Sequence, residues 1–381
     1  MKKGVIIGAG IGGLSTAIAL AQKGIEVTIY EQAPELKEVG AGIWVAPNGL
    51  KVYEKLGIVD EIIKAGQSLE LISAVDINGK VISTINSSRV RKTHKYSTVA
   101  IHRGVLHKKL VSYIDPAKII LNKSFKSYKQ TANSVIAEFQ DGTSVEADFL
   151  IVADGIKSKA RMQMQSSLNL RYSGQTCWRF VTNFNLPKEE LGKMSEIWAD
   201  EKGLRAAYSK INDEQTYCYI TNFQDAGGKD NKETLKADLL KLCANFNSQV
   251  KELINSCNVD DIIRSDLFDF KPIKKWTDGR VVLIGDAAHA TTPNLGQGAC
   301  QAIEDAYVIA NELATIDSIE DAFKSFQNKR IKKATSITNT SYQFAQMTNT
   351  TGFKKRFVKM ILRLTPDSIN DKQIDKIYNI E

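Results

Sequence analysis

Short apolar runs and helical spacings alternate at the start of the chain. Residues 4–7 and 26–30 predict two buried strands, and residues 14–23 between them have the periodicity of a helix that Gly24 ends. A strand, a helix and a second strand in this order predict a βαβ unit. Because the two strands of such a unit are parallel, the pattern indicates a doubly wound α/β sheet.

The same alternation returns later in the chain. Strands are expected within residues 119–152, with a tight turn at Asp141-Gly142, and again at residues 280–284. Helical periodicity marks residues 103–113 and 297–313. We therefore expect segments that are far apart in the sequence to build one parallel sheet.

Stretches of a different character interrupt this pattern. Residues 172–223 are rich in Trp, Tyr and Phe with alternating polarity, which predicts an antiparallel sheet, and residues 70–85 predict a hairpin that turns at Asn78-Gly79. Residues 231–253 have the pattern of one amphipathic helix. The expected fold is a doubly wound α/β domain interrupted by a mostly antiparallel β-sheet domain with helices, and completed by C-terminal helices. The α/β domain is assigned residues 1–70, 98–168 and 275–381, and the sheet domain residues 71–97 and 169–274.

Composition and charge narrow the functions that the chain can have. Its 381 residues are 43% hydrophobic and 25% charged, which is ordinary for a globular protein of two domains. The net charge of +8 comes from scattered Lys and Arg, so nucleic-acid binding is not expected. Five cysteines without a Cys-x-x-Cys pair argue against a disulfide framework, and four histidines without zinc spacing argue against a metal site.

The N-terminus imitates an export signal, because Lys2-Lys3 precedes an apolar stretch. Glycines interrupt that stretch, which predicts a strand and a loop instead, and no apolar run approaches the length of a membrane span. We therefore expect a cytoplasmic protein.

A glycine-rich signature, Gly8-Ala9-Gly10-Ile11-Gly12-Gly13, follows the first strand. Gly8 allows a tight turn, Gly10 lets a phosphate approach the backbone, and Gly13 lets the helix pack closely on the strand. The helix N-terminus then points free N–H groups at a pyrophosphate. Glu31 ends the second strand, where a carboxylate can bind both ribose hydroxyls. The motif predicts a dinucleotide but does not separate FAD from NAD.

Two further signatures, Asp154-Gly155 and Gly285-Asp286, lie where later buried strands end. Nucleotides bind at such strand ends in α/β sheets. Asp286 can hydrogen-bond the ribityl chain of FAD, and the turn Gly296–Gly298 opens a helix whose amides can face the flavin pyrimidine edge, where the reduced ring is negative. Asp154 also fits a purely structural Asp-Gly turn. Three strand-end sites in this order indicate an extended dinucleotide, which favours FAD.

Together these residues resemble the single-component (class A) FAD-dependent aromatic hydroxylases and epoxidases, which have the para-hydroxybenzoate hydroxylase fold. Gly8–Gly13, Asp154–Arg161 and Gly285-Asp286 match the three motifs of that family in order. The resemblance implies a Rossmann-like FAD-binding domain of the GR2 type. Further motifs are similar to the branch of zeaxanthin epoxidase, urate hydroxylase and salicylate hydroxylase, namely Glu38–Ile43, Ile101–Arg103, Tyr172–Trp178 and Pro293–Gly298.

The resemblance implies non-covalent FAD as cofactor, with NADPH or NADH and O₂ as co-substrates. In this family NAD(P)H reduces the flavin, O₂ gives a C4a-hydroperoxide, and one oxygen passes to the substrate. A planar aromatic, heteroaromatic or polyene molecule would be hydroxylated or epoxidised. The flavin carries this chemistry, so no side chain is expected as a catalytic nucleophile, and His289 is expected to be structural. A flavin dehydrogenase or reductase without oxygen insertion, and a non-catalytic flavoprotein, are the alternatives.

The motifs and the resemblance together give the expected cofactor site. By analogy Arg103 contacts the diphosphate or the flavin, and Asp154 with Arg161 helps to bind FAD and NAD(P)H. The expected cofactor-binding residues are Gly8, Gly10, Ile11, Gly12, Gly13, Glu31, Gln32, Gly42, Ile43, Arg103, Asp154, Asp286, Pro293, Gly296, Gln297, Gly298 and Ala299.

Substrate contacts are expected from the antiparallel sheet. Arg205 and Tyr217 are the best candidates, and Tyr219 shares the strand face of Tyr217 because side chains alternate with a period of two. Trp178 and Arg179 lie on an earlier strand. A buried Arg beside aromatic rings suits a planar ligand that is anionic or carries a carbonyl. An ordinary aromatic core with solvated arginines explains the same residues equally well.

Near the C-terminus, residues 353–364 place apolar side chains on one helical face and five cations elsewhere. Such a basic amphipathic helix can make weak contact with an anionic membrane surface, but it can also pack its apolar face on its own domain. We expect a monomer or a homodimer.

Overall fold

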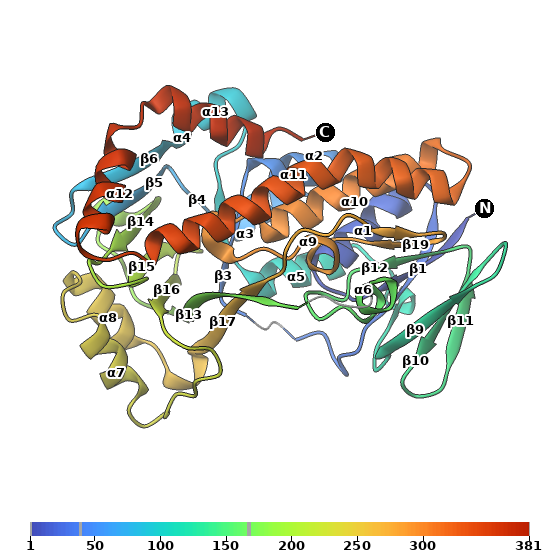
Figure 1. The fold of residues 1–381 in the computed structure, drawn as a ribbon, viewed down its shortest axis with the longest axis horizontal. Helices are drawn as coiled ribbons and strands as arrows, with labels where there is room; N and C mark the ends of the chain where they lie inside the picture. The colour runs from blue at the N-terminus through green and yellow to red at the C-terminus, as the bar shows by residue number, and fades with distance from the viewer. Residues whose placement is uncertain (1, 38–39, 166–168, 381) are drawn as a thin grey trace.

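A six-stranded sheet forms the centre of the computed structural model, which describes residues 2–37, 40–165 and 169–380 (Figure 1). Its strands are β1 (Lys3–Ile7), β2 (Glu26–Tyr30), β8 (Ile119–Ile120), β12 (Phe149–Val152), β18 (Thr277–Asp278) and β19 (Val281–Leu283). Five of them are parallel in the order β19-β12-β1-β2-β8, and β18 pairs antiparallel with β19 at the edge. The apolar runs that predicted these strands are buried: every residue of β12 and β19 lies in the core.

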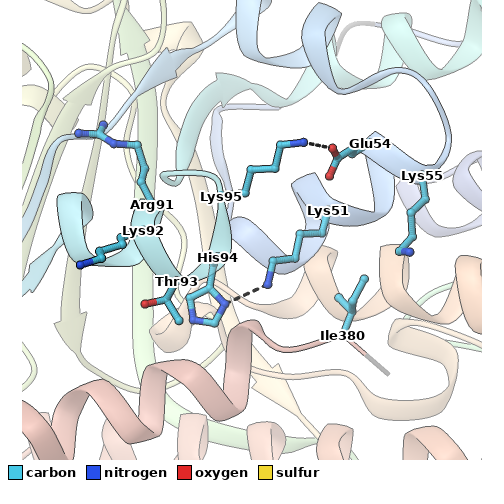
Figure 2. Close-up of a pocket in the computed structure, with 9 residues that line it drawn as sticks. All are labelled: Lys51, Glu54, Lys55, Arg91, Lys92, Thr93, His94, Lys95 and Ile380. Carbon is cyan, nitrogen blue, oxygen red and sulfur yellow. Dashed lines mark hydrogen bonds and ion pairs between the residues drawn. The ribbon is translucent and has the colours of Figure 1, made fainter.

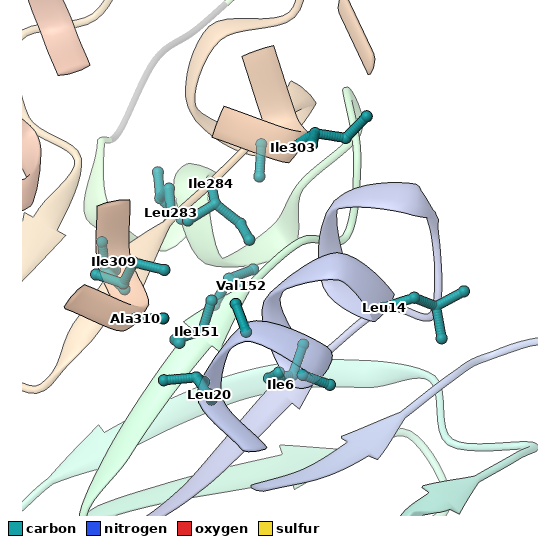
Figure 3. Close-up of a cluster of buried hydrophobic side chains, with 14 of the residues drawn as sticks. Ile6, Leu14, Leu20, Ile151, Val152, Leu283, Ile284, Ile303, Ile309 and Ala310 are labelled. Carbon is teal, nitrogen blue, oxygen red and sulfur yellow. The ribbon is translucent and has the colours of Figure 1, made fainter. Parts of the chain in front are cut away.

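Two helices, α1 (Ile11–Gln22) and α10 (Gly298–Thr315), pack against each other and against the central strands. Figure 3 shows side chains from both helices beside those of the strands, with Leu20 and Ala310 near Ile151. Gly13 brings α1 close to its strand, since a Cβ there would stand 2.0 Å from the carbonyl oxygen of Gly8. A helix that begins directly at a strand end is thereby fixed in place.

Smaller elements surround the sheet. An antiparallel meander of three strands contains β9 (Phe125–Gln130), β10 (Val135–Phe139) and β11 (Ser144–Ala147). Another small sheet has the order β3-β7-β4, with β3 (Gly42–Val45), β4 (Gln67–Ser68) and β7 (Val99–His102). The helices of this part of the chain are α2 (Pro47–Lys55), α3 (Val59–Ala65), α5 (Arg103–Val111) and α6 (Lys159–Met164).

The second large sheet has seven strands, as the alternating and aromatic-rich stretches predict. They are β5 (Leu71–Asp76), β6 (Val81–Asn86), β13 (Arg171–Thr182), β14 (Lys193–Trp198), β15 (Arg205–Lys210), β16 (Thr216–Phe223) and β17 (Ile263–Asp269). The order is β17-β13-β16-β15-β14-β5-β6, and only the β14–β5 pair is parallel within this sheet. The fold is therefore a doubly wound α/β fold interrupted by a mostly antiparallel sheet. The residue boundaries assigned to the two domains stay a prediction.

The single helix expected over residues 231–253 is wrong. The structure has two helices there, α7 (Leu235–Leu242) and α8 (Ser248–Ser256). Asn247 separates them because its side-chain oxygen accepts the N–H of Val250 at 3.2 Å and so starts a new helix. Both helices cover one face of the seven-stranded sheet.

The C-terminal part is helical. It contains the short α9 (Asp286–His289), α11 (Ile319–Thr348), α12 (Gly352–Leu364) and α13 (Asp367–Tyr378). Figure 1 shows α11 running the length of the molecule, from α10 toward the seven-stranded sheet. Helix α13 returns to α2 and α4 (Ser87–His94), where Arg89 pairs with Asp371 and Asp375. Within the described ranges no helix combines the length and the apolar character that crossing a membrane requires.

A buried charge network joins α10 to α11. Arg330 on α11 is fully buried and donates from Nε to Asp305 at 2.8 Å and from Nη1 to Glu304 at 2.6 Å. The second carboxylate oxygen of Asp305 accepts the N–H of Gly285 at 2.9 Å and lies 2.6 Å from Nε2 of His289. Burial alone would raise the pKa of Asp305, but the charges of His289 and Arg330 outweigh burial and lower that pKa to about 2.

Replacing Gly13 tests the close approach of α1 to β1. In the Gly13→Ala variant the added Cβ collides with the backbone of Gly8, so we expect the free energy of unfolding to fall by about 1–3 kcal/mol. The control is Gly10→Ala, whose Cβ would meet no atom within 4 Å. That control should change the free energy of unfolding by less than about 1 kcal/mol. Urea unfolding of the protein without added ligand measures the free energy of unfolding of both variants, and equal values for the two would contradict the packing argument.

Removing Arg330 tests the buried network. The Arg330→Met variant removes the cation that Glu304 and Asp305 share, although Lys333 still pairs with Glu304 at 2.8 Å and His289 still lies beside Asp305. We therefore expect the free energy of unfolding at pH 7 to fall by about 3 kcal/mol, the low end for breaking a buried ion pair. Because the pKa of Asp305 is lower in the folded state, its stabilisation is complete above its ordinary pKa and is lost as the pH falls toward 2. The difference in the free energy of unfolding between wild type and variant should therefore become smaller below about pH 4. Lys324→Met, on the same helix but in an exposed ion pair with Asp321, is the control and should keep near wild-type stability.

Candidate active site

The turn between β1 and α1 has the geometry of a phosphate-binding loop. Gly8 has a φ of +101°, and a Cβ there would stand 2.5 Å from the carbonyl oxygen of Ala153. Gly10 is the N-cap of α1 and has no side chain to bond the first amides, and the space beside its Cα is open. Ile11 is buried, and Gly12 faces Ala302 of α10, 3.1 Å from an added Cβ. Free amides facing open space are what an approaching phosphate requires.

Glu31 follows β2 and holds the glycine loop from the side. One of its carboxylate oxygens accepts the N–H of Ala9 at 2.7 Å, and the other accepts the N–H of Ala33 at 2.9 Å. Each oxygen keeps a further lone pair for a hydroxyl group. The next residue, Gln32, has an exposed side chain. Beside Glu31 lies a cavity of about 340 Å³, lined by Ala9, Gly10, Glu31, Ala33, Pro34, Glu35, Leu36, Lys37, Arg103 and His107.

Helix α5 closes this cavity with two cationic or titratable side chains. Arg103 begins the helix with an exposed side chain, and its stem packs where a Cβ on Gly40 would be, at 3.2 Å. His107, one turn later, lies with Nε2 2.7 Å from the carbonyl oxygen of Ala9. Of the expected motif Glu38–Ile43, Glu38 and Val39 lie outside the described residues. Arg103, an expected cofactor residue, therefore lines this cavity, and so does His107, which was not expected from the sequence.

The third signature forms a tight turn after β19. Gly285 has a φ of +55°, and Asp286 begins α9 with an exposed side chain. Partial desolvation by the surrounding protein raises the pKa of Asp286, although the positive charges of His289 and Arg103 act against it. A Cβ on Gly298 would lie 4.0 Å from Asp286 Oδ1. The Gly285-Asp286 turn and the start of α10 therefore converge.

The second signature connects the ends of β12 and β19. Asp154 accepts the N–H of Lys159 at 3.0 Å, and Ser158 caps α6 by accepting the N–H of Arg161 at 3.1 Å. Arg161 is buried and donates to the carbonyl oxygen of Ala287 at 3.0 Å. Burial raises the pKa of Asp154. These contacts give Asp154 and Arg161 a structural role at this turn. Their role in cofactor binding stays a prediction.

The start of α10 is positioned by a side chain that sequence reasoning missed. Gln297 is the N-cap, and its Oε1 accepts from Asn48 Nδ2 at 3.0 Å. Asn48 on α2 also donates to Glu304 at 2.6 Å. Before the cap, Pro293 is exposed and Gly296 has a φ of +62° beside the ring of Trp44, 3.5 Å from an added Cβ. Gly298 and Ala299 follow in the first turn, both half-buried.

An aromatic wall, formed by Trp44, Tyr217 and Tyr219, faces this turn. The Trp44 ring lies 6.3 Å from that of Tyr217 and 5.9 Å from that of Tyr219, in edge-on geometry. Gly42 allows β3 to approach, because a Cβ there would stand 2.2 Å from the ring of Tyr217. Ile43 lies between Gly42 and Trp44 on β3 and is half-buried. Burial raises the pKa of both tyrosines, so their hydroxyls stay protonated.

Arg205 on β15 reaches from the seven-stranded sheet to the turn before α10. Its side chain is 3% exposed, pairs with Glu196 through Nη1 and donates from Nη2 to Asn294 Oδ1 at 2.6 Å. The guanidinium lies over the ring of Phe344, 5.5 Å from its centre. Its Nε–H is buried and has no hydrogen-bond partner among the described residues. A buried, rigidly held donor of this kind suits an oxygen of a ligand.

Alternation along the strands separates the expected substrate residues. Tyr219 pairs with Arg179 across the sheet, and both lie on the face of Arg205 and Tyr217. Trp178 points to the opposite face, where it packs in the core beneath α7 and α8 and donates from Nε1 to Asp230 at 2.7 Å. The structure brings the other four residues together but not Trp178. Glu196 and Asn294 were missed, because nothing in the local sequence links them to Arg205.

His289 is buried beside Asp305 and against the ring of Trp276, as expected of a structural histidine. A larger cavity, about 690 Å³, lies apart from all these residues, between α2, α4 and the C-terminus (Figure 2). Figure 2 shows its basic lining, in which Lys51 approaches His94 Nδ1 at 2.9 Å and Lys95 pairs with Glu54. None of the expected site residues lines it.

Comparison with known proteins agrees with this geometry. Residues 2–341 match the family model described as FAD binding domain. The chain is 33% identical over 350 residues to the aurachin C monooxygenase/isomerase of Stigmatella aurantiaca, covering 91% of this chain and 90% of that protein. It is 30% identical over 332 residues to the FAD-dependent urate hydroxylase of Klebsiella pneumoniae, covering 86% and 85%.

A solved structure extends the likeness to three dimensions. The crystal structure of Klebsiella pneumoniae HpxO complexed with FAD and uric acid superposes with a TM-score of 0.91 and 27% identity, covering 99% of this chain and 96% of that chain. The chain therefore belongs to the class A flavin monooxygenases, a family of FAD-dependent oxidoreductases.

Proposed function

We propose that this enzyme uses FAD, NADPH or NADH and O₂ to hydroxylate a planar aromatic heterocycle. The observation that carries the proposal is Arg205, a buried cation whose Nε–H has no partner among the described residues and which shares a sheet face with Tyr217 and Tyr219 of the aromatic wall. The names of relatives support the substrate class: they include urate hydroxylase and, at 28% identity over 349 residues, the 6-hydroxynicotinate 3-monooxygenase of Pseudomonas fluorescens.

The residues present fit FAD. Gly10 leaves open space before the amides of α1, and Glu31 offers two carboxylate oxygens that are already oriented by the backbone. Asp286 and the first turn of α10 converge at the other end of the same sheet edge. We propose the expected residues as the cofactor site, with His107 added through its contact to Ala9.

FAD, when bound, supplies the chemistry: it takes electrons from the nicotinamide and activates O₂ for insertion into the substrate. The protein has to balance charge, and the unpaired amides of α10 after Gln297 form a positive dipole end suited to this. Asn48 fixes that end by binding both Gln297 and Glu304. The network through Glu304 and Asp305 to Arg330 then keeps α10 in place.

The proposed substrate site combines a charged hydrogen-bond donor, Arg205, with neutral aromatic rings. Glu196 and Asn294 hold the Arg205 guanidinium in one position, so its remaining N–H can orient a carbonyl or anionic oxygen without first losing side-chain freedom. Tyr217 and Tyr219 present neutral rings that favour a planar ligand and exclude water.

A substrate screen tests the proposed reaction. FAD-loaded protein is mixed with NADPH or NADH and a set of planar heterocycles, including urate, 6-hydroxynicotinate and alkylquinolones. We expect one of them to accelerate NAD(P)H oxidation with matching O₂ uptake and to gain one oxygen atom by mass spectrometry. NAD(P)H consumption with a changed product but no O₂ uptake would select a dehydrogenase or reductase instead. A flavin that NAD(P)H does not reduce in the presence of any ligand would favour a non-catalytic flavoprotein.

Replacing Arg205 tests its role toward the substrate. In Arg205→Met we expect kcat/KM for the substrate found in the screen to fall about 100-fold, roughly 3 kcal/mol, because a buried charged donor is lost. The flavin absorbance spectrum should be unchanged. Lys210→Met is the control, since Lys210 is also a buried cation on β15 but bonds Asn185 and Asp213 at the far end of the strand. An Arg205→Met enzyme with wild-type kcat/KM would contradict the proposed contact.

Replacing Gly10 tests the cofactor loop. The Cβ of Gly10→Ala occupies the space before the α1 amides, so we expect the Kd for FAD to rise more than tenfold, at least about 1.4 kcal/mol. Fluorescence quenching during titration with FAD measures the Kd. Wild-type affinity in this variant would show that no phosphate approaches Gly10.

A further inference from the structure

Helix α12 turns part of its polar side toward the protein. Lys355 and Lys359 are only 2% and 5% exposed. Lys355 donates to the carbonyl oxygen of Glu201, and Lys359 donates to Asp200 at 2.8 Å and to the carbonyl oxygen of Trp198 at 3.3 Å. An amphipathic helix that completes its own domain buries its apolar side instead. Because Lys355 and Lys359 point inward, α12 is not oriented to pack its apolar side on its own domain.

The apolar side of α12 faces outward. Phe353 is 83% exposed and Leu364 is 72% exposed, and the rings of Phe353 and Phe357 stack with their centres 6.4 Å apart. These side chains recur at helical spacing and form one strip, which we call the α12 strip: Phe353, Phe357, Met360, Ile361 and Leu364. A continuous exposed strip of this kind marks an interaction surface.

The orientation of α12 is fixed by bonds rather than by apolar packing. Arg363 donates from Nη2 to Asp76 at 2.6 Å and from Nε to the carbonyl oxygen of Val81 at 3.0 Å, which ties the helix to the β5–β6 hairpin. Figure 1 shows α12 at the outer edge of the seven-stranded sheet beside β6. Burial lowers the pKa of Lys355 to about 8, and the carbonyl contact compensates for that burial. Rotating the strip inward would break all of these contacts.

Charge indicates what the strip binds. The sequence of α12 contains five Lys or Arg residues and no Asp or Glu. Lys354 and Arg356 are exposed and flank the strip, where long cationic side chains can reach lipid headgroups while apolar neighbours enter the acyl boundary. We propose that α12 docks the enzyme on an anionic lipid surface, lying in the plane of that surface.

A second copy of the chain fits this face less well. A two-fold dimer would place α12 against α12, because both partners use the same patch. The cations Lys354 and Arg356 would then approach each other without an acidic residue on either helix to balance them. A helix of 13 residues is also about 20 Å long, too small to supply a stable dimer interface of about 1,200 Å² alone.

Vesicle sedimentation tests the proposal with the full-length, FAD-loaded enzyme. The probes are vesicles of phosphatidylcholine alone and of phosphatidylcholine mixed with phosphatidylglycerol. We expect binding to the mixed vesicles, weakened by high salt, and at least tenfold weaker binding to phosphatidylcholine. The double variant F353S/F357S should lower the partition coefficient about tenfold or more, and K354E/R356E should abolish the preference for phosphatidylglycerol.

The matched control is Leu191→Ser, which removes an apolar side chain of 49% exposure outside α12 and should bind vesicles as wild type does. The flavin spectrum and thermal midpoint confirm that each variant is folded. Equal partition of wild type and F353S/F357S, or no sedimentation of wild type with mixed vesicles, would overturn the proposal. So would a wild-type dimer in solution that F353S/F357S converts to a monomer, because the strip would then be occupied by a second copy.

Discussion

The start of α10 depends on one buried cation. Arg330 pairs with both Glu304 and Asp305 in the core and so joins the two carboxylates, whereas Lys333 pairs with Glu304 and His289 lies beside Asp305. Through Asp305 the network binds the N–H of Gly285, and through Glu304 it binds Asn48, which in turn holds Gln297. The turn after β19, the amide end of α10 and helix α2 are therefore positioned together, and these are the elements that converge on the proposed flavin site.

Features that depend on neighbouring residues could be predicted from the sequence. The buried strands follow from apolar runs, and the conformations of Gly8 and Gly285 follow from their places between a strand and a helix. The period of two placed Tyr217 and Tyr219 on one face. Arg205 lies on a neighbouring strand, and it is the register between the two strands that puts it on the same face. The same period excludes Trp178 from that face, because Trp178 is adjacent to Arg179 on its strand. Applying this alternation to Trp178 and Arg179 would have removed Trp178 from the expected substrate residues.

Features that depend on long-range contacts could not be predicted. Asn48 lies 249 residues from Gln297, and Asn294 lies 89 residues from Arg205, so no local pattern links these pairs. The break between α7 and α8 was not predicted, because the helical periodicity of apolar residues continues across Asn247. Amphipathicity identified α12 as a helix with two faces, but only its bonds to Asp200 and Asp76 decide which face points outward.

The central claim is that this chain holds FAD along three strand ends and passes oxygen to a ligand held by Arg205. Turnover under isotopically labelled O₂, followed by mass spectrometry of the product, tests it most directly. The account predicts that one labelled oxygen atom appears in the product and that unlabelled water contributes none. A product that carries oxygen from water, or labelled hydrogen peroxide with an unchanged substrate for every heterocycle tried, would contradict it.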